Sequence, residues 1–370
     1  MRTDPLLDVA GCELDELERA LERRGAQRFH ARQIYQWVHR RGVTDFDAMT
    51  DLSRALRARL GDECRITTPA VVETARSSDG TTKFLLELED GSRIESVFIP
   101  DAPPAGADGR RERRTFCVST QVGCAMKCGF CLTGKMGIVR NLSAGEIAGQ
   151  VRVLCRELGL LDARFNVVLM GMGEPLHNYD ATMKALRMLA EPRGLAVSPR
   201  RMTLSTVGVL PALERLASEL LMPNLAISLH STTEDQRDRL VPINRKYGLK
   251  DLVDACSRFP LKRRNRITFE YVLLEGVNDT PEDARRLVAL LHGLRAKVNL
   301  LPLNEAPGIP FKRPSDERVN RFAQILADRS VTVSVRRSRG RDIRAACGHL
   351  ITESARARTP AQQLANLIQG

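Results

Sequence analysis

The pattern of hydrophobic and polar positions changes near residue 115. From there on, short apolar runs alternate with longer stretches in which apolar residues recur every three or four positions. The short runs predict strands and the longer stretches predict helices. The predicted strands are 115–120, 165–171, 202–206, 225–229, 267–274, 297–303 and 331–335. The predicted helices between them are 143–159, 180–190, 211–221, 249–258, 281–293 and 315–328.

Repeated strand–helix units imply a parallel sheet that is covered by helices. With roughly six or seven such units, the pattern predicts an α/β fold, a partial or complete (β/α) barrel over residues 115–350. In such barrels the functional residues lie at the carboxyl ends of the strands. We therefore expect the chemistry of this chain just after its predicted strands.

Residues 1–100 follow another pattern. Three helical stretches come first, and three strands separated by Gly-containing turns follow. The helices are predicted at 13–24, 30–41 and 51–60, and the strands at 71–76, 83–89 and 93–100. This pattern predicts a small α+β accessory domain over 1–100. Residues 101–114 are rich in Pro, Gly and charge and predict a linker, and 351–370 predict a C-terminal helical tail.

The composition indicates a cytoplasmic globular protein. The chain has 370 residues, of which 43% are hydrophobic, and no run approaches the roughly 18 apolar residues of a membrane span. The first residues lack the apolar stretch of a signal peptide. In a cytoplasmic protein, nine cysteines favour metal binding or catalysis over a disulfide framework.

The formal net charge of +12 indicates a polyanionic partner. Basic residues gather in three runs, at 110–114, 262–266 and 336–344. A single run is more often a solvated face, but three runs with a global excess favour nucleic acid. Aromatic residues make up only 4% of the chain, which argues against extensive base-stacking platforms. We expect the accessory domain to help bind folded RNA.

Cys124, Cys128 and Cys131 lie within one segment, GCAMKCGFCLTG. Thiolates suit iron–sulfur clusters and zinc, but structural zinc sites usually take two ligands from each of two knuckles. Three cysteines would leave one iron of a four-iron cluster open to another ligand. The glycines of the segment favour a loop that folds around a ligand. A zinc site and three unrelated buried thiols are the alternatives.

Further motifs accompany the cysteine segment: IESVFIP, LMGMGEPLHN, RMTLSTVGVLP, AISLHSTTEDQRDRLVPINRKY and RGRDIRAACGHL. Together they resemble the radical S-adenosylmethionine (SAM) enzymes and, more narrowly, the RlmN/Cfr group of RNA adenosine methyltransferases. The likeness spans most of the chain. A lone Cys-x3-Cys-x2-Cys segment would indicate only the superfamily.

The resemblance implies two cofactors, one [4Fe–4S] cluster per chain and two SAM molecules per turnover. It implies that the three clustered cysteines hold the cluster, whose open iron binds the amino and carboxylate groups of SAM. By the same resemblance, the SAM contacts are Gly173, Glu174, Ser205, Ser228, Leu229, His230 and Asn304. Taken singly, each of these residues would be ordinary loop polarity or a helix cap.

The resemblance also implies three catalytic residues. Cys347 resembles the cysteine that carries the methyl group, and Cys117 resembles the resolving cysteine, which attacks the Cys347 sulfur and leaves a Cys117–Cys347 disulfide. Glu95 matches the general base that takes the adenine proton. Taken alone, Cys117 would be a core residue of a strand and Glu95 a solvent-facing strand residue.

The function that the resemblance implies is methylation of adenosine C2 in 23S rRNA, at the peptidyl-transferase centre, and in tRNA, at the adenosine 3′ of the anticodon. One alternative is an enzyme that methylates C8 of the same rRNA adenosine and confers antibiotic resistance. A zinc-containing RNA-binding protein is the alternative outside catalysis. The expected reducing partner is a flavodoxin, and the expected oligomeric state is a monomer. Glu305, Arg341, Arg344 and His349 depart from the family pattern.

Overall fold

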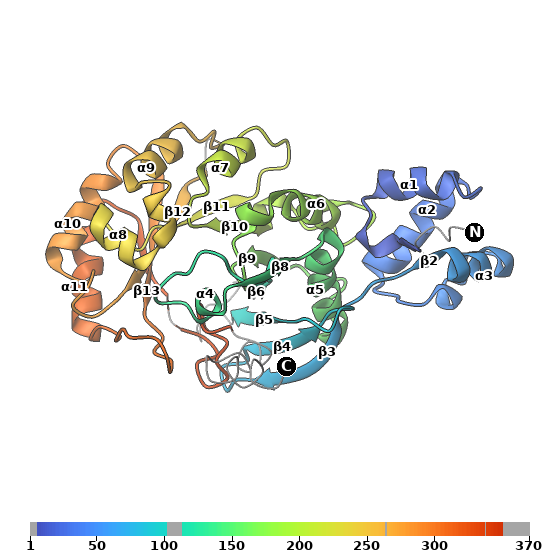
Figure 1. Cartoon of the computed structure of the whole chain (residues 1–370), viewed down its shortest axis with the longest axis horizontal. Coiled ribbons are helices and arrows are strands. Elements are labelled where there is room, and N and C mark those ends of the chain that lie inside the picture. Colours follow the sequence, from blue (N-terminus) through green and yellow to red (C-terminus); the bar gives the residue numbers. More distant parts are fainter. Residues whose placement is uncertain (1–5, 102–112, 263–264, 337, 351–370) are drawn as a thin grey trace, which may run out of the picture.

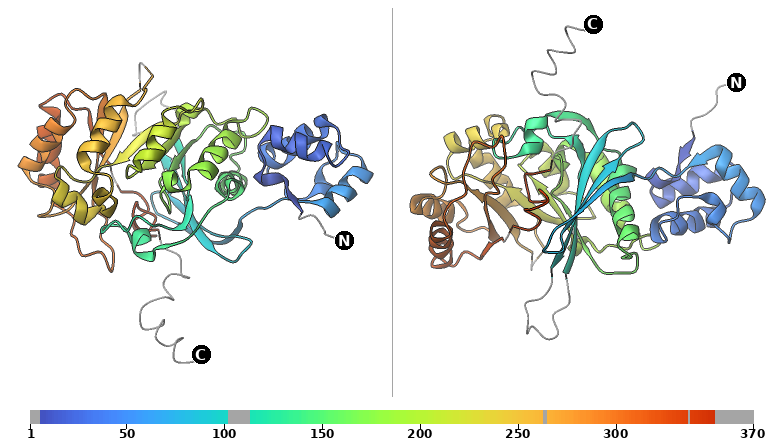
Figure 2. Two further views of the ribbon diagram at one scale, coloured as in Figure 1. Left: turned by 45° about the horizontal axis from the view of Figure 1, so that its top comes forward. Right: turned by 90° about the horizontal axis from the view of Figure 1, so that it is seen from below.

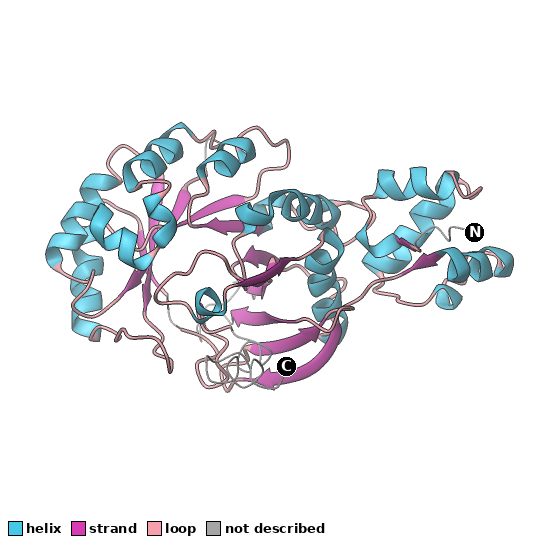
Figure 3. Ribbon diagram, viewed as in Figure 1, coloured by secondary structure: helices cyan, strands magenta, loops and turns pink. Residues whose placement is uncertain are grey.

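The computed structural model describes residues 6–350 except 102–112, 263–264 and 337. Its centre is a ten-stranded sheet with helices packed around the outer face, and a smaller helical unit lies at one end (Figures 1 and 3). The predicted linker lies mostly outside the described residues, and the predicted C-terminal helical tail lies wholly outside them.

Seven neighbouring strands of the sheet run parallel and form an open barrel. They are β6 (Arg113–Cys117), β9 (Asn166–Leu169), β10 (Met202–Thr206), β11 (Asn224–Ser228), β12 (Ile267–Leu273), β13 (Ala296–Pro302) and β14 (Val333–Val335). The principal covering helices are α5 (Ala144–Glu157), α6 (Tyr179–Ala190), α7 (Leu210–Leu216), α9 (Leu249–Arg258), α10 (Pro281–Leu290) and α11 (Asp316–Ala327). The predicted α/β fold with a partial barrel is confirmed.

Burial explains why these segments form these elements. The middle residues of β11, Leu225 to Ile227, are all buried, as expected for a strand with both faces covered. Helix α9 buries Leu249, Leu252, Ala255 and Cys256, which share one face. Helix α5 begins at a capping box in which Ser143 and Glu146 satisfy each other's backbone N–H groups.

Three antiparallel strands extend the same sheet beyond β6. They are β3 (Ala70–Arg76), β4 (Thr82–Glu87) and β5 (Arg93–Asp101), and β5 pairs with β6 from Val97↔Cys117 to Asp101↔Arg113. The strands that the sequence assigned to an accessory domain over 1–100 therefore lie in the central sheet. The separate unit is helical, with α1 (Leu14–Glu22), α2 (Arg28–Tyr35), η2 (Gln36–Arg40) and α3 (Arg54–Glu63) around its own core.

The helical unit packs against α5 and α6 of the barrel (Figure 1). A side chain at Gly145 would lie 2.9 Å from the Cα atom of Gly11, so α5 and the N-terminal segment meet at backbone distance. The Tyr35 hydroxyl donates to the Met188 carbonyl at 3.3 Å, and Lys184 Nζ pairs with Glu16 at 2.6 Å. These contacts fix the unit against the outside of the barrel.

The C-terminal segment covers the opening between the two edges of the sheet, where β14 and β3 do not pair. The backbone N–H of Gly340 donates to Asp79 Oδ2 at 3.0 Å, and Ser77 Oγ donates to Asp342 Oδ1 at 2.6 Å. Ser77 and Asp79 belong to the turn between β3 and β4. Figure 2 shows the segment beside this β-hairpin.

The sequence pattern did not predict the short elements around the first barrel loop. These are the hairpin of β7 (Gln121–Gly123) and β8 (Ile138–Asn141), helix α4 (Leu132–Met136) and helix α8 (Glu234–Leu240). Each is too short to show a clear period. Within the described ranges, none of the helices has the length and apolarity needed to cross a membrane.

Candidate active site

A cavity of about 200 Å³ opens at the carboxyl ends of the parallel strands. Its walls come from the last residues of β6, β9, β10, β11, β12 and β13, from the loops that follow these strands, and from the C-terminal segment. Eleven of the thirteen residues that the resemblance assigns to the site line it; Glu95 and Leu229 do not. Assigned residues from Cys117 to Cys347 thus meet at the end of the barrel where function was expected.

The three clustered cysteines lie on one loop between β7 and α4, and all three line the cavity. Two glycines make this loop possible. A side chain at Gly123, whose φ is +79°, would lie 1.9 Å from the Gly137 carbonyl oxygen, and one at Gly134 would lie 2.9 Å from the Cys128 nitrogen. The Cys124 N–H donates to the Gly137 carbonyl at 2.9 Å, which ties the start of the loop to its end. The predicted loop is confirmed.

Burial makes these thiols poor acids in the absence of a metal. It raises the pKa of Cys124 to about 12, and it raises the pKa of Cys128 and of Cys131 as well. Among the described residues, no three His, Cys, Asp or Glu side chains are arranged to hold a single metal ion. A four-iron cluster fits this donor set because its thiolates bind separate iron atoms and need only face one shared volume.

Gly173 and Glu174 follow β9. Gly173 has a φ of +106°, and a side chain there would lie 2.8 Å from the Gln121 nitrogen. Glu174 is only 3% exposed. Its two carboxylate oxygens accept from the backbone N–H groups of Leu176, at 3.0 Å, and Val207, at 2.9 Å. Burial still dominates and raises the pKa of Glu174 to about 7. This carboxyl group therefore joins the loops after β9 and β10.

Ser205 and Ser228 stand on adjacent parallel strands, with their hydroxyl oxygens 3.4 Å apart. His230 has a left-handed backbone with a φ of +61°. Its Nδ1 accepts from the Val272 N–H at 3.0 Å, so the proton of a neutral ring lies on Nε2. Burial and then the charge of Arg237 lower the pKa of His230 to about 3, which keeps this ring neutral.

Leu229 and Asn304 differ in how they meet the cavity. Leu229 is fully buried behind the wall, and its N–H donates to the Glu270 carbonyl at 3.0 Å. Asn304 lines the cavity, and its Oδ1 is a buried acceptor for which the described residues offer no donor. His349, one of the residues that depart from the family pattern, places Nε2 2.8 Å from the Asn304 carbonyl oxygen.

Cys117 and Cys347 line the same cavity from opposite parts of the chain. Cys117 is buried at the end of β6, whereas Cys347 is exposed in the C-terminal segment. Burial and then the nearby Cys347 thiol raise the pKa of Cys117 to about 12. Both cysteines are free thiols here, so the disulfide that the resemblance implies stays a prediction.

Glu95 lies in β5, beside the cavity wall and not in it. It is buried, and its carboxylate pairs with Lys83 Nζ at 2.8 Å. The strand register pairs Val97 with Cys117. Since side chains alternate along a strand, Glu95, two residues before Val97, faces the same side of the sheet as Cys117.

Three charged residues of the site were not predicted from the sequence. Arg237 is buried beneath the loops that follow β10 and β11, and Glu270 and Arg336 line the cavity near Cys117 and Cys347. The charge of Cys347 is the largest cause that raises the pKa of Arg336. A charged residue in a sequence usually predicts an exposed side chain. The only sign in the sequence that Glu270 and Arg336 belong to the site is that each lies in or just after a predicted strand.

An open (β/α) barrel with three thiols on the loop after its first parallel strand defines the radical SAM class of enzymes. Residues 118–288 match the radical SAM superfamily, and residues 7–66 match the family described as the ribosomal RNA large subunit methyltransferase N-terminal domain. This class uses a [4Fe–4S] cluster and SAM.

The comparisons with whole proteins narrow the class. The chain is 48% identical to the dual-specificity RNA methyltransferase RlmN of Geobacter sulfurreducens, over 94% of this chain and 92% of the relative. It is 48% identical to the protein of the same name from Syntrophobacter fumaroxidans, over 92% and 96%. A solved radical SAM methyltransferase from Sphaerobacter thermophilus superposes with a TM-score of 0.87 at 45% identity, covering 93% of this chain and 99% of that one. The chain belongs to the RlmN family of radical SAM methyltransferases.

Proposed function

We propose that this protein is a dual-specificity RNA methyltransferase that methylates C2 of adenosine in 23S rRNA, at the peptidyl-transferase centre, and in tRNA, at the adenosine 3′ of the anticodon. The observation that carries the proposal is that eleven of the thirteen residues assigned through the family line one cavity. The proposed location is the cytoplasm, the proposed electron donor is a flavodoxin, and the proposed state is a monomer.

Cys124, Cys128 and Cys131 would hold the cluster, which, with SAM bound, supplies the radical chemistry that a weakly nucleophilic ring carbon requires. The chain's own groups would position SAM. The carboxylate of Glu174 suits an ammonium group because the bond is charge-assisted. The Ser205 and Ser228 hydroxyls, the Nε2–H of His230 and the Oδ1 of Asn304 offer the polar contacts around it. The buried, partnerless Oδ1 of Asn304 supports a ligand at this wall.

The proposed methyl carrier is Cys347, whose exposure in the cavity wall suits a thiol that must meet both SAM and RNA. The proposed resolving residue is Cys117. Its thiolate would attack the Cys347 sulfur, so that a sulfur–sulfur bond forms and the sulfur–carbon bond to the methylated base breaks. A thiol reductant would then restore both thiols. Glu95, on the same sheet face as Cys117, is the proposed base for the adenine proton.

The deciding experiment is mass spectrometry of nucleosides from 23S rRNA and tRNA after incubation with the cluster-loaded protein, SAM and a reductant. We expect 2-methyladenosine in both RNAs, and none with the Cys347→Ala variant. The isomer 8-methyladenosine would instead assign the C8 reaction. No methyladenosine in either RNA would refute the proposal, and iron and zinc analysis of the same sample would then test the RNA-binding alternative.

A further inference from the structure

A second hollow, of about 400 Å³, lies at the other end of the barrel. It is bounded by the last residue of η2 in the helical unit, the loop that leads into β9 and the loop that leads into β10. Because these loops precede their strands, the hollow lies at the amino ends of β9 and β10, whereas the active-site cavity lies at their carboxyl ends. We call it the rear hollow; the helical unit that contributes to it is seen beside α5 and α6 in Figure 1.

Packing between the two units holds the walls of the rear hollow in place. A side chain at Gly194 would lie 3.2 Å from both the His39 Cβ atom and the Tyr35 ring, so the loop after α6 contacts the helical unit directly. A side chain at Gly42 would lie 3.7 Å from Leu161. The hollow is therefore a product of the docked arrangement, and neither unit forms it alone.

The charge of the rear hollow is positive. Arg40, Arg164 and Arg201 line it, against the single carboxylate of Asp162. Arg40 and Arg164 are exposed and Arg201 is half-buried. Across the residues that the structure describes, none of these three guanidinium groups has a side-chain hydrogen bond or an ion pair. Arg187, at the contact between the two units, is by contrast paired with Glu13.

A guanidinium group presents a planar fork of donors that fits phosphate oxygens. Three unpaired guanidinium groups around one concave site suit a chain of phosphates better than a single small anion. We propose that the rear hollow binds the phosphate backbone of the RNA substrate, at a point remote from the adenosine in the active site. The inference rests on the proposed function and adds a second docking point to it.

The geometry predicts which RNAs use the rear hollow. Strands β9 and β10 have four and five residues, so their ends are roughly 15 Å apart at about 3.3 Å per residue, and the loops add to this separation. An RNA that fills the active site and also reaches the rear hollow must pass along the side of the barrel. A full-length tRNA has further arms whose phosphates can follow that path while its anticodon loop fills the active site, and an isolated anticodon stem-loop lacks those arms.

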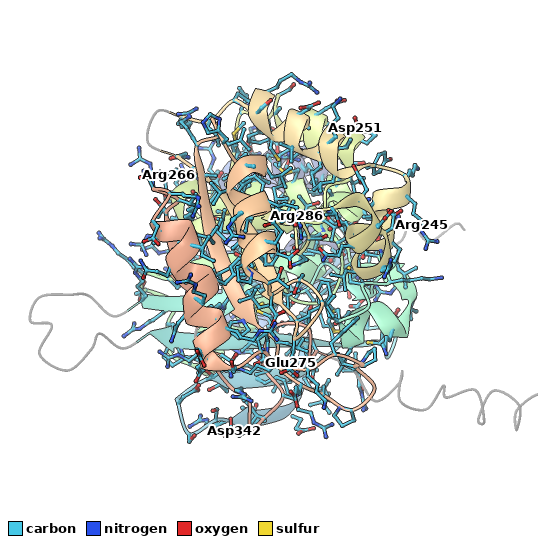
Figure 4. All side chains as sticks on the ribbon, turned by 90° about the vertical axis from the view of Figure 1, so that its left-hand side faces the viewer. Arg245, Asp251, Arg266, Glu275, Arg286 and Asp342 are labelled. Atoms are coloured by element: carbon cyan, nitrogen blue, oxygen red, sulfur yellow. The ribbon has the colours of Figure 1, made fainter. Side chains whose placement is uncertain are left out.

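The test compares binding of full-length tRNA and of its anticodon stem-loop by fluorescence anisotropy at several salt concentrations. The variant is Arg40→Gln/Arg164→Gln/Arg201→Gln. The charge-matched control is Arg258→Gln/Arg285→Gln/Arg321→Gln, which removes three exposed arginines from α9, α10 and α11. These helices cover the outside of the barrel on the side away from the helical unit, which is the side that faces the viewer in Figure 4.

Each lost phosphate contact reduces the steepness with which the logarithm of the binding constant falls with the logarithm of salt concentration, by about 0.7–0.9. At 0.1 M salt this corresponds to an affinity about five- to eightfold lower. If at least two of the three arginines contact phosphates, we expect full-length tRNA to bind the variant about 25-fold or more weakly, with a slope lower by about 1.5. Stem-loop binding should change less than twofold. The control should bind both RNAs nearly as the wild type does.

Three results would overturn the inference: unchanged binding of full-length tRNA, an equal loss with the control, or an equal loss with the stem-loop. A loss of turnover only when an acidic electron-transfer protein replaces a chemical reductant would assign the hollow to that protein instead. The binding assay needs no turnover. A wild-type protein that methylates neither RNA would refute the proposed function while the anisotropy data still decide the rear hollow.

Discussion

Arg237 allows a prediction whose size follows from the structure. This side chain in α8 is fully buried beneath the active-site loops. It donates to the Val207 carbonyl at 2.7 Å, to Asn244 Oδ1 at 2.8 Å and to the Leu229 carbonyl at 3.2 Å. Burial lowers the pKa of Arg237 to about 10, so it remains a cation at neutral pH. One charged group therefore fixes the loops after β10 and β11 together.

The change Arg237→Leu removes all of these donors and leaves their acceptors buried. Hydrogen bonds to charged groups contribute about 1.5–3 kcal/mol each, but the leucine no longer carries the cost of burying a guanidinium group. A buried acceptor left without its donor costs about 1–3 kcal/mol, so the three acceptors, less the removed burial cost, should lower the free energy of unfolding by roughly 3–5 kcal/mol. At about 2 °C per kcal/mol for a domain of this size, Tm should fall by roughly 6–10 °C.

The assay is urea unfolding of the cluster-free protein, followed by SAM titration of the cluster-loaded protein. The matched control is Arg239→Leu, an exposed position on the same helix, which should change stability by less than about 0.5 kcal/mol. For Arg237→Leu we expect both lower stability and weaker SAM binding, because Arg237 holds the end of β11 and the loop after it, where Ser228 and His230 lie. A stability loss below about 1 kcal/mol with unchanged SAM affinity would refute this account of the network.

Three further predictions concern the cavity. Cys117→Ala should trap a covalent protein–RNA adduct, visible as a nuclease-sensitive band on a denaturing gel; free methylated RNA at the normal rate would remove Cys117 from resolution. Cys347→Ala should abolish RNA methylation while reductive SAM cleavage, followed by chromatography of 5′-deoxyadenosine, continues. Burial raises the pKa of Glu174 from the usual 4.5 to about 7 in the folded state. At a pH between these two values, the folded chain keeps a proton on Glu174 that the unfolded chain has lost. Stability should therefore fall as pH rises through this window, and SAM affinity should rise, since the ammonium group favours the carboxylate; Glu174→Gln should flatten both profiles in calorimetry.

Local signals were enough to predict most of the barrel. The strand predicted at 202–206 has those bounds in the structure, and the helix predicted at 249–258 also does. Both depend on periodicity and flanking residues, which a sequence displays directly. The pairing of β5 with β6 cannot be predicted in this way, because the segment between the two strands is charged, rich in Pro and Gly, and typical of a linker. The sequence consequently predicted a domain boundary at residue 100, where the structure has a continuous sheet.

The same distinction holds for the site. Cysteines and motif residues were identifiable because their spacing and neighbours are specific. Arg237 was not, since an arginine in a run of charged residues predicts a solvent-facing position and only tertiary packing buries it. His230 gives no sign in the sequence of its left-handed backbone, which is set by contacts with β12. Residues that act through the placement of others are visible only once the fold brings them together.

The position of Cys347 shows why the antiparallel strands matter to the active site. The C-terminal segment that carries this thiol is tied on one side to the turn of β3 and β4, through Gly340 and Asp79. On the other side the Leu132 N–H, at the end of the cysteine loop, donates to the Gly348 carbonyl at 2.8 Å. The segment that carries the Cys347 thiol is thus held between the antiparallel strands of the sheet and the loop that would hold the cluster. Strands that the sequence placed in the accessory domain thus hold the segment from which the proposed methyl carrier faces its substrates.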